Sequence, residues 1–176
     1  MTKALINRLR ELGWHIATVE SCTGGSLAAA ITDVPGASDV YGTGYVTYSK
    51  GAKRQLANLG RHRPLQDAIT DHGVYSSQTA LGMAEAGRRA SGAEVCVAVT
   101  GMLNTGHPDD PAYVGCVADV AVVIQGKSGH RALLPPVQTR FYLNDAGRTR
   151  PELKVILVDL IVGLVLSALE DVKEGS

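Results

Sequence analysis

The sequence is poor in aromatic residues, in net charge of either sign and in cysteine. Aromatic residues make up only 5% of the 176 residues, so base-stacking platforms for nucleic acid are not expected. Lys plus Arg and Asp plus Glu both number 17, which leaves a formal net charge of +0. Without a net positive field to attract a polyanion, a nucleic-acid partner is not expected. A small-molecule ligand or substrate fits this balance better.

The sequence also lacks cysteine pairs, a signal peptide and a membrane-spanning run. Its three cysteines form no CxxC motif, and an odd number of unclustered cysteines favours reduced thiols in a cytoplasmic protein. The segment 1–12 carries charges throughout, unlike a signal peptide. The most apolar run, 155–169, is interrupted by Asp159 and is shorter than the ~20 residues that a span requires. We therefore expect a buried helix there and no membrane partner.

Apolar residues make up 45% of the chain, enough for one compact domain over residues 1–176. Helical spacing and β-branched runs alternate along it. Helices are expected over 4–12, 26–32, 52–59, 77–90 and 152–172, strands over 15–20, 44–49, 95–99 and 114–124, and non-regular segments over 61–64, 102–112 and 126–129. Residues 131–143 are expected to form an edge strand or a broken one, because Pro135-Pro136 cannot donate to a sheet. This pattern predicts an α/β fold, a three-layer α/β/α sandwich with a mixed sheet.

Glycine is in excess, with 20 residues, and its most informative cluster is Glu20-Ser21-Cys22-Thr23-Gly24-Gly25. This segment follows a predicted strand and precedes a predicted helix, where backbone amides favour negative charge. Ser21 is placed like a nucleophile whose oxyanion is held by nearby amides, and Cys22 beside it is a rival nucleophile. The simpler alternative is that Ser21 or Thr23 only caps the helix.

A second cluster joins the end of a predicted strand to the next helix and contains Tyr48 and Lys53. The two side chains could converge across the turn. Lys53 can act as a base only if its pKa falls well below ~10.4, and burial or the neighbouring cations Lys50 and Arg54 would lower it. The alternative is a solvated surface lysine.

Further candidates lie at Thr100-Gly101, after a buried strand, and at Arg150, before the last helix. Ligands of α/β sheets bind beyond the carboxyl ends of strands, and an arginine can hold a phosphate or carboxylate bidentately. Each could equally have a surface or structural role. No metal site is expected, because the five histidines form no ligand pattern; His107 is the weak exception.

Together these segments resemble the C-terminal domain of the CinA (competence/damage-inducible protein) family, which is similar to stand-alone nicotinamide mononucleotide (NMN) deamidases. The resemblance rests on ESCTGG at 20–25, TDVPGAS at 32–38, GYVTYS at 44–49 with Lys53, Thr100-Gly101, Val114-Gly115 and the basic turn before the last helix. It implies an α/β/α sandwich and a Ser/Lys hydrolase without metal or cofactor.

Carried over position by position, the resemblance implies that Ser21 is the nucleophile and Lys53 the base. Tyr48 and Ser38 would assist in the site, and Ser38 is the alternative nucleophile. The substrate-binding residues would be Cys22, Thr23, Gly24, Gly25, Thr100, Gly101 and Arg150.

Several segments depart from the family pattern. The family's glycine-rich loop reads Met102–Pro108 here and has lost most of its glycines. Ala112-Tyr113 replaces a Lys-Pro, Ser49-Lys50 replaces a Ser-Asn, and Asn144–Ala146 lacks one arginine. The nucleophile half of the site therefore matches the family better than the substrate half.

The leading hypothesis is hydrolysis of NMN to nicotinate mononucleotide and ammonia. The alternatives are a nucleotide-binding or small-ligand-binding protein without deamidase activity, and a hydrolase of another small amide. The apolar last helix further predicts a homo-oligomer, with a dimer as the first expectation.

Overall fold

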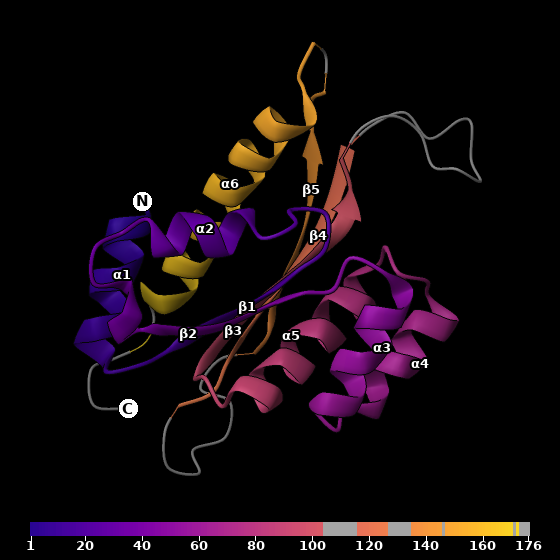
Figure 1. Ribbon diagram of the computed structural model, residues 1–176, viewed down its shortest axis with the longest axis horizontal. Coiled ribbons are helices and arrows are strands. Elements are labelled where there is room, and N and C mark those ends of the chain that lie inside the picture. The colour runs from indigo at the N-terminus through magenta and orange to yellow at the C-terminus, as the bar shows by residue number, and fades with distance from the viewer. Residues whose placement is uncertain (104–115, 127–134, 146, 171, 173–176) are drawn as a thin grey trace.

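The structure, a computed structural model, describes residues 1–103, 116–126, 135–145, 147–170 and 172. Its centre is a five-stranded sheet in the order β2-β1-β3-β4-β5 (Figure 1). The strands are β1 (Ile16–Glu20), β2 (Tyr41–Val46), β3 (Val95–Met102), β4 (Cys116–Ile124) and β5 (Val137–Leu143). β1 pairs in parallel with β2 and β3, whereas β4 is antiparallel to both β3 and β5. The prediction of a mixed sheet is confirmed.

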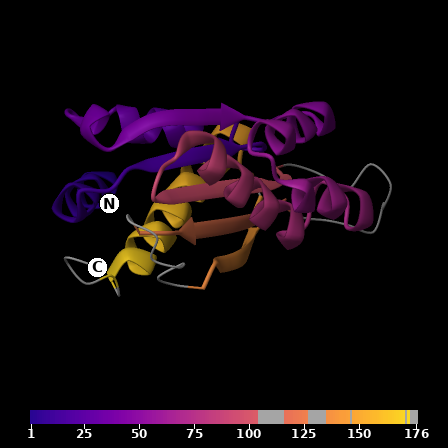
Figure 2. The ribbon, with the colours of Figure 1, turned by 90° about the horizontal axis from the view of Figure 1, so that it is seen from below.

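Helices cover both faces of this sheet (Figure 2). One face packs against α1 (Thr2–Leu12), α2 (Ser26–Thr32) and α6 (Arg150–Glu170), and the other against α3 (Lys50–Leu59), α4 (Arg63–Asp71) and α5 (Ser77–Ser91). A short 3-10 helix, η1 (Ala37–Asp39), precedes β2. Each face has its own buried apolar core, as a three-layer α/β/α sandwich requires.

The central strands are buried along almost their whole length, which explains their near-continuous apolar sequence. β2 alternates between partly buried and exposed positions, as expected at a sheet edge. β5 is the other edge and begins directly after Pro136, so the predicted edge strand is confirmed for 137–143. Within the described segments, no helix combines the length and apolarity needed to cross a membrane.

Two sequence predictions are wrong in their bounds. Residues 61–64 were predicted to be a polar connection, but the helix α4 begins at Arg63, with Pro64 in its first turn and Leu65 and Ile69 buried one turn apart. The strand predicted over 44–49 ends at Val46, because Ser49 caps α3 by accepting a hydrogen bond from the Ala52 amide. Most of the predicted turn at 126–129 and most of the predicted 102–112 loop lie outside the described residues.

Gly101 illustrates why part of the glycine excess is structural. A Cβ at this position would lie 2.6 Å from Ala118 Cα and would also collide with the Val117 carbonyl oxygen of β4. Glycine is therefore required here for the close approach of two strands.

We expect Gly101→Ala to lower the free energy of unfolding by about 1–3 kcal/mol, because the added methyl must displace backbone. Urea unfolding measures the change. Gly42→Ala in β2 is the matched control, since its Cβ would meet no atom within 4 Å. Equal stability of the two variants would contradict the packing role of Gly101.

Candidate active site

The turn that joins β1 to α2 lies at the carboxyl end of the parallel strands and begins with Ser21. The Ser21 amide donates to the Val99 carbonyl of β3 (3.0 Å), and the Gly24 amide donates to the Ser21 carbonyl (3.0 Å). Gly24 (φ 61°) and Gly25 (φ 99°) adopt left-handed backbone conformations that glycine accepts without strain. The paired glycines therefore allow the chain to reverse within a few residues of the serine.

The structure brings Lys53 of α3 onto Ser21. Lys53 Nζ donates to Ser21 Oγ at 2.8 Å and to the Thr47 carbonyl oxygen at 2.7 Å. Ser21 and Lys53 are 3% and 1% exposed, respectively. Lys53 is not the solvated surface lysine of the simpler hypothesis: its amine is held in hydrogen-bond contact with a buried hydroxyl, the arrangement of a nucleophile and its base.

Burial lowers the pKa of Lys53 from 10.5 to about 8, opposed by the electrostatic influence of Cys22. From the sequence, burial or the neighbouring cations Lys50 and Arg54 were the expected causes of a lowered pKa. Lys50 and Arg54 are exposed, and burial is the dominant cause. At neutral pH about a tenth of the lysine is then unprotonated and able to accept a proton.

This shift predicts a pH-dependent stability. Between pH 8 and 10.5 the unfolded chain binds more protons at Lys53 than the folded one, so the free energy of unfolding rises with pH in this window. Lys53→Met removes the titrating group. We expect the parent to gain about 3 kcal/mol relative to Lys53→Met from pH 8 to 10.5, as measured by urea unfolding at each pH. A constant difference would show that the Lys53 pKa is not lowered.

Glu20 is the last residue of β1, and its side chain lies at the start of α2. Its fully buried carboxylate accepts hydrogen bonds from the amides of Gly25 (3.0 Å), Leu27 (3.0 Å) and Ala28 (2.9 Å). Neither Ser21 nor Thr23 caps α2 with its side chain, so the simpler alternative of a helix cap at these residues is wrong. The Gly25 amide therefore donates to Glu20 and is not available to a substrate oxygen. Within the described residues no carbonyl accepts from the amides of Cys22 and Thr23.

Cys22 and Thr23 have buried side chains. Burial raises the pKa of the Cys22 thiol to about 12, although the backbone of Cys22 and Thr23 and the charges of Lys53 and Arg150 oppose the shift. A thiol with this pKa is a poor nucleophile at neutral pH, so the structure favours Ser21 over Cys22. Thr23 Oγ1 is buried without a hydrogen-bond partner among the described residues.

Tyr48 and Arg150 meet at the rim of the turn. Arg150 Nη2 donates to Tyr48 Oη at 3.1 Å, and the tyrosine is 63% exposed. Lys154 lies one helical turn beyond Arg150, and its Nζ is 3.2 Å from the position that a Cβ on Gly24 would occupy. Lys154 was not predicted from the sequence, although its spacing of four residues from Arg150 places both on one face of the helix.

Thr100 lies beside the turn, one residue beyond Val99, and is fully buried. Its Oγ1 donates to the Val74 carbonyl at 2.7 Å, so its proton is already committed to the backbone. Opposite it in β4, Asp119 is held by two hydrogen bonds from Arg140, at 2.9 and 3.0 Å. While Thr100 Oγ1 donates to Val74, this hydroxyl can only accept a hydrogen bond from a ligand.

The structure does not bring Ser38 to the site, which corrects that expectation for a single chain. Ser38 is exposed in η1, before β2, whose first residue Tyr41 pairs with Ile16 at the start of β1. Ser21 follows the other end of β1, so the strand separates the two serines by roughly 13 Å.

Nowhere in the described ranges do three or more His, Cys, Asp or Glu side chains gather as a metal site. His107 lies outside the described residues.

Comparisons with known proteins agree with this fold. The family model described as the CinA C-terminal domain matches residues 1–135. A CinA-like protein of Geotalea uraniireducens is 37% identical over 123 residues, which cover 70% of this chain and 27% of that protein. A CinA-like protein of Syntrophobacter fumaroxidans is 33% identical over 133 residues, covering 74% and 30%, respectively. The chain thus spans less than a third of the length of these curated relatives.

Solved structures match over nearly the whole chain. The competence/damage inducible protein CihA of Agrobacterium tumefaciens shares 30% identity with a TM-score of 0.77, covering 97% of this chain and 93% of its own. A competence or damage-inducible protein of Enterobacter asburiae shares 25% identity with a TM-score of 0.79, covering 96% and 95%. From the family match and these relatives, the chain belongs to the family of the CinA C-terminal domain.

Proposed function

We propose that this protein is an amidohydrolase that converts NMN to nicotinate mononucleotide and ammonia by a Ser/Lys mechanism that requires no metal ion. The observation that carries the proposal is the 2.8 Å contact between Ser21 Oγ and Lys53 Nζ in a buried site. A lysine with a pKa of about 8 can exchange protons near neutral pH. The resemblance to the deamidases supplies the substrate.

The reaction proceeds through an ester on Ser21. Ser21 Oγ attacks the carboxamide carbon while neutral Lys53 takes the hydroxyl proton. The carbon–nitrogen bond of the tetrahedral intermediate then breaks as Lys53 returns the proton to the departing nitrogen, which leaves as ammonia. Water, deprotonated by Lys53, attacks the ester carbon. The bond from this carbon to Ser21 Oγ then breaks as Lys53 returns the proton to Oγ, and the released acid loses its own proton to water to give the carboxylate.

The oxyanion of the intermediate is assigned to the amides of Cys22 and Thr23. Among the described residues these two amides have no carbonyl acceptor and face the weakly accepting sulfur of Cys22. The Gly24 amide donates to the Ser21 carbonyl and the Gly25 amide to the Glu20 carboxylate. One well-placed donor contributes about 3 kcal/mol to the transition state. Cys22 and Thr23 thus act through their backbone, which accords with their buried side chains.

Substrate recognition is assigned to the rim formed by Tyr48 and Arg150. The guanidinium makes no ion pair with a described carboxylate and so can receive the substrate's phosphate. The exposed Tyr48 ring offers a face to the pyridine ring. This assignment rests on the resemblance as well as on the contact between these two residues.

The lowered pKa of Lys53 predicts the pH profile of the reaction. The base is active when neutral, so kcat/KM should rise about tenfold per pH unit below pH 8 and level off above it. Initial rates of ammonia release across this range measure the profile. A kcat/KM independent of pH from 6 to 9 would contradict general-base catalysis by Lys53.

Incubation of the purified protein with NMN, with ammonia as the readout and Ser21→Ala as the control, tests the function. Turnover by the parent alone supports the proposal. No turnover above the control would contradict it, and calorimetry would then show whether the protein only binds the nucleotide. A panel of amides without phosphate distinguishes a hydrolase of another small amide.

Two further parts of the proposal concern the setting of the enzyme. We infer a homo-oligomer, in the first instance a dimer, because Val155, Ile156 and Leu160 are exposed on α6 at 64%, 36% and 39%. A monomeric mass by light scattering would contradict it. We also infer a cytoplasmic location, supported by Cys22 and Cys96, two buried cysteines with free thiols.

A further inference from the structure

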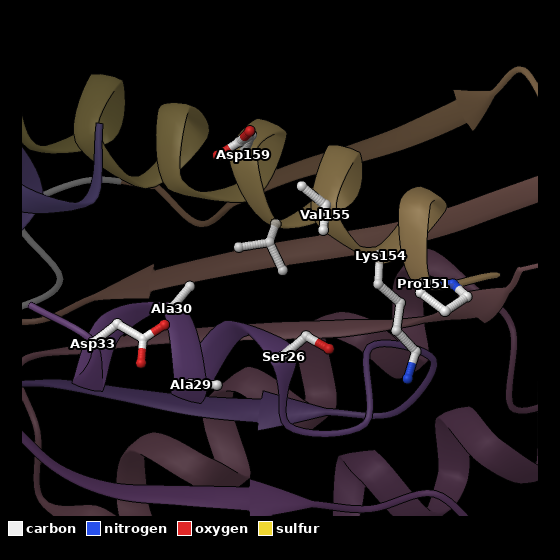
Figure 3. A pocket seen from close by; sticks show the side chains of 9 residues that line it. Ser26, Ala29, Ala30, Asp33, Pro151, Lys154, Val155 and Asp159 are labelled. Carbon is white, nitrogen blue, oxygen red and sulfur yellow. The ribbon is translucent and has the colours of Figure 1, made fainter. Parts of the chain in front are cut away.

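A cavity of about 500 Å³ lies between α2 and α6 (Figure 3). These helices cover one face of the sheet, whereas Lys53 approaches Ser21 from α3 on the other face. The cavity is therefore distinct from the Ser21–Lys53 pair. No step of the proposed reaction uses it.

The two ends of this cavity carry opposite charge. Lys154 and the hydroxyl of Ser26 line one end, and Asp33 of the α2 end and Asp159 of α6 line the other (Figure 3). Within the described part of the chain, none of these three charged side chains has an ion pair or a hydrogen bond. One cation and two carboxylates therefore line the same cavity without an ion pair to another described residue.

The wall between the charged ends is apolar. It is lined by Ala29 and Ala30 of α2 and by Val155 and Val158 of α6. Small residues on α2 leave room for a ligand, and the valines provide a surface that favours hydrocarbon over water. An ordered polar molecule alone would leave this middle section unmatched.

From this arrangement we propose that the α2–α6 cavity binds a small zwitterion whose anionic and cationic groups are separated by a short hydrocarbon chain. The anion pairs with Lys154 and the cation with Asp33 and Asp159. We choose 6-aminohexanoate as the probe, because five methylene groups separate its ammonium from its carboxylate.

The α2–α6 cavity adjoins the turn between β1 and α2 through Lys154, whose Nζ lies beside Gly24. An anion that draws this ammonium toward the cavity changes the charge next to the turn. Binding should therefore alter the environment of the Gly24 amide as well as that of the cavity walls.

The test is an NMR titration of the full chain with 6-aminohexanoate, hexanoate and hexylamine. We expect shifts at Ala29, Ala30, Val155 and Gly24, and binding of the zwitterion up to about fivefold tighter than of either singly charged analogue, since a lost exposed ion pair costs up to about that factor. Lys154→Met should weaken 6-aminohexanoate about fivefold, as should Asp33→Asn combined with Asp159→Asn. Lys3→Met and Asp71→Asn, at exposed positions of α1 and α4, are matched controls.

Equal affinity for the three probes, undiminished zwitterion binding by Lys154→Met, or no shift at the cavity residues would each overturn the proposal. Because binding rather than turnover is measured, the result is independent of whether NMN is a substrate. Heteronuclear spectra of each variant with dispersion like the parent's establish that it is folded.

Discussion

Ser21→Ala is expected to lower kcat/KM for amide hydrolysis by at least about 10⁴-fold, since removing the nucleophile of a catalytic pair leaves only binding and oxyanion contacts. Among the described residues, Ser21 Oγ is the hydroxyl that Lys53 Nζ contacts. Cys22 beside it is buried, and burial raises its pKa to about 12. The measurement is ammonia release under conditions in which the parent is active.

The matched control is Ser38→Ala. Ser38 is exposed at the opposite end of β1, so this variant should keep the activity of the parent. If Ser38→Ala were the inactive variant and Ser21→Ala the active one, the nucleophile assignment would be reversed. A partner subunit that contributes Ser38 would then have to complete the site.

Lys53→Met is expected to cause a loss of the same order. Lys53 Nζ is the group in hydrogen-bond contact with Ser21 Oγ, so without it the hydroxyl has no base to take its proton. Lys53→Arg should not restore activity, because a guanidinium stays protonated in this pH range. The double variant Ser21→Ala/Lys53→Met should be no less active than either single variant, because the two residues act as a unit. Steady-state kinetics of the four proteins measure this.

Circular dichroism and urea unfolding accompany these assays, because Lys53→Met leaves the Thr47 carbonyl without its 2.7 Å donor. Activity of a folded Lys53→Met above a hundredth of the parent's would contradict the role of Lys53 as base. Fully additive losses in the double variant would show that the two residues act independently.

The fold was largely predictable because most of its strands have a recognisable local sequence pattern. Val95–Val99 is continuously apolar and becomes the buried core of β3, and Pro135-Pro136 correctly marks an edge strand. The helix α4 was missed because only two of its residues, Leu65 and Ile69, carry the apolar repeat. Strand β2 was misplaced by three residues since its bounds are set by pairing with β1 and by the Ser49 cap.

The site was predictable to the extent that a known motif contains it. The local sequence made Ser21 and Lys53 candidates, and the resemblance paired them as nucleophile and base. Their 2.8 Å contact depends on how α3 packs beside β1. The role of Glu20 could not be anticipated, because a carboxylate preceding a turn can point to either face of the sheet. Lys154 and Gly24 are distant in sequence, and they meet because α6 lies beside the start of α2.

The central claim is that Lys53 activates Ser21 as a nucleophile, and the rate of covalent labelling by a fluorophosphonate tests it without reference to any natural substrate. Intact mass and peptide mapping follow the adduct at a series of pH values. The account predicts one adduct, on Ser21, forming at a rate that rises with pH to a plateau with a midpoint near 8, and at least about 100-fold more slowly in Lys53→Met. Labelling of Lys53→Met at the parent's rate, or an adduct on another residue, would contradict it.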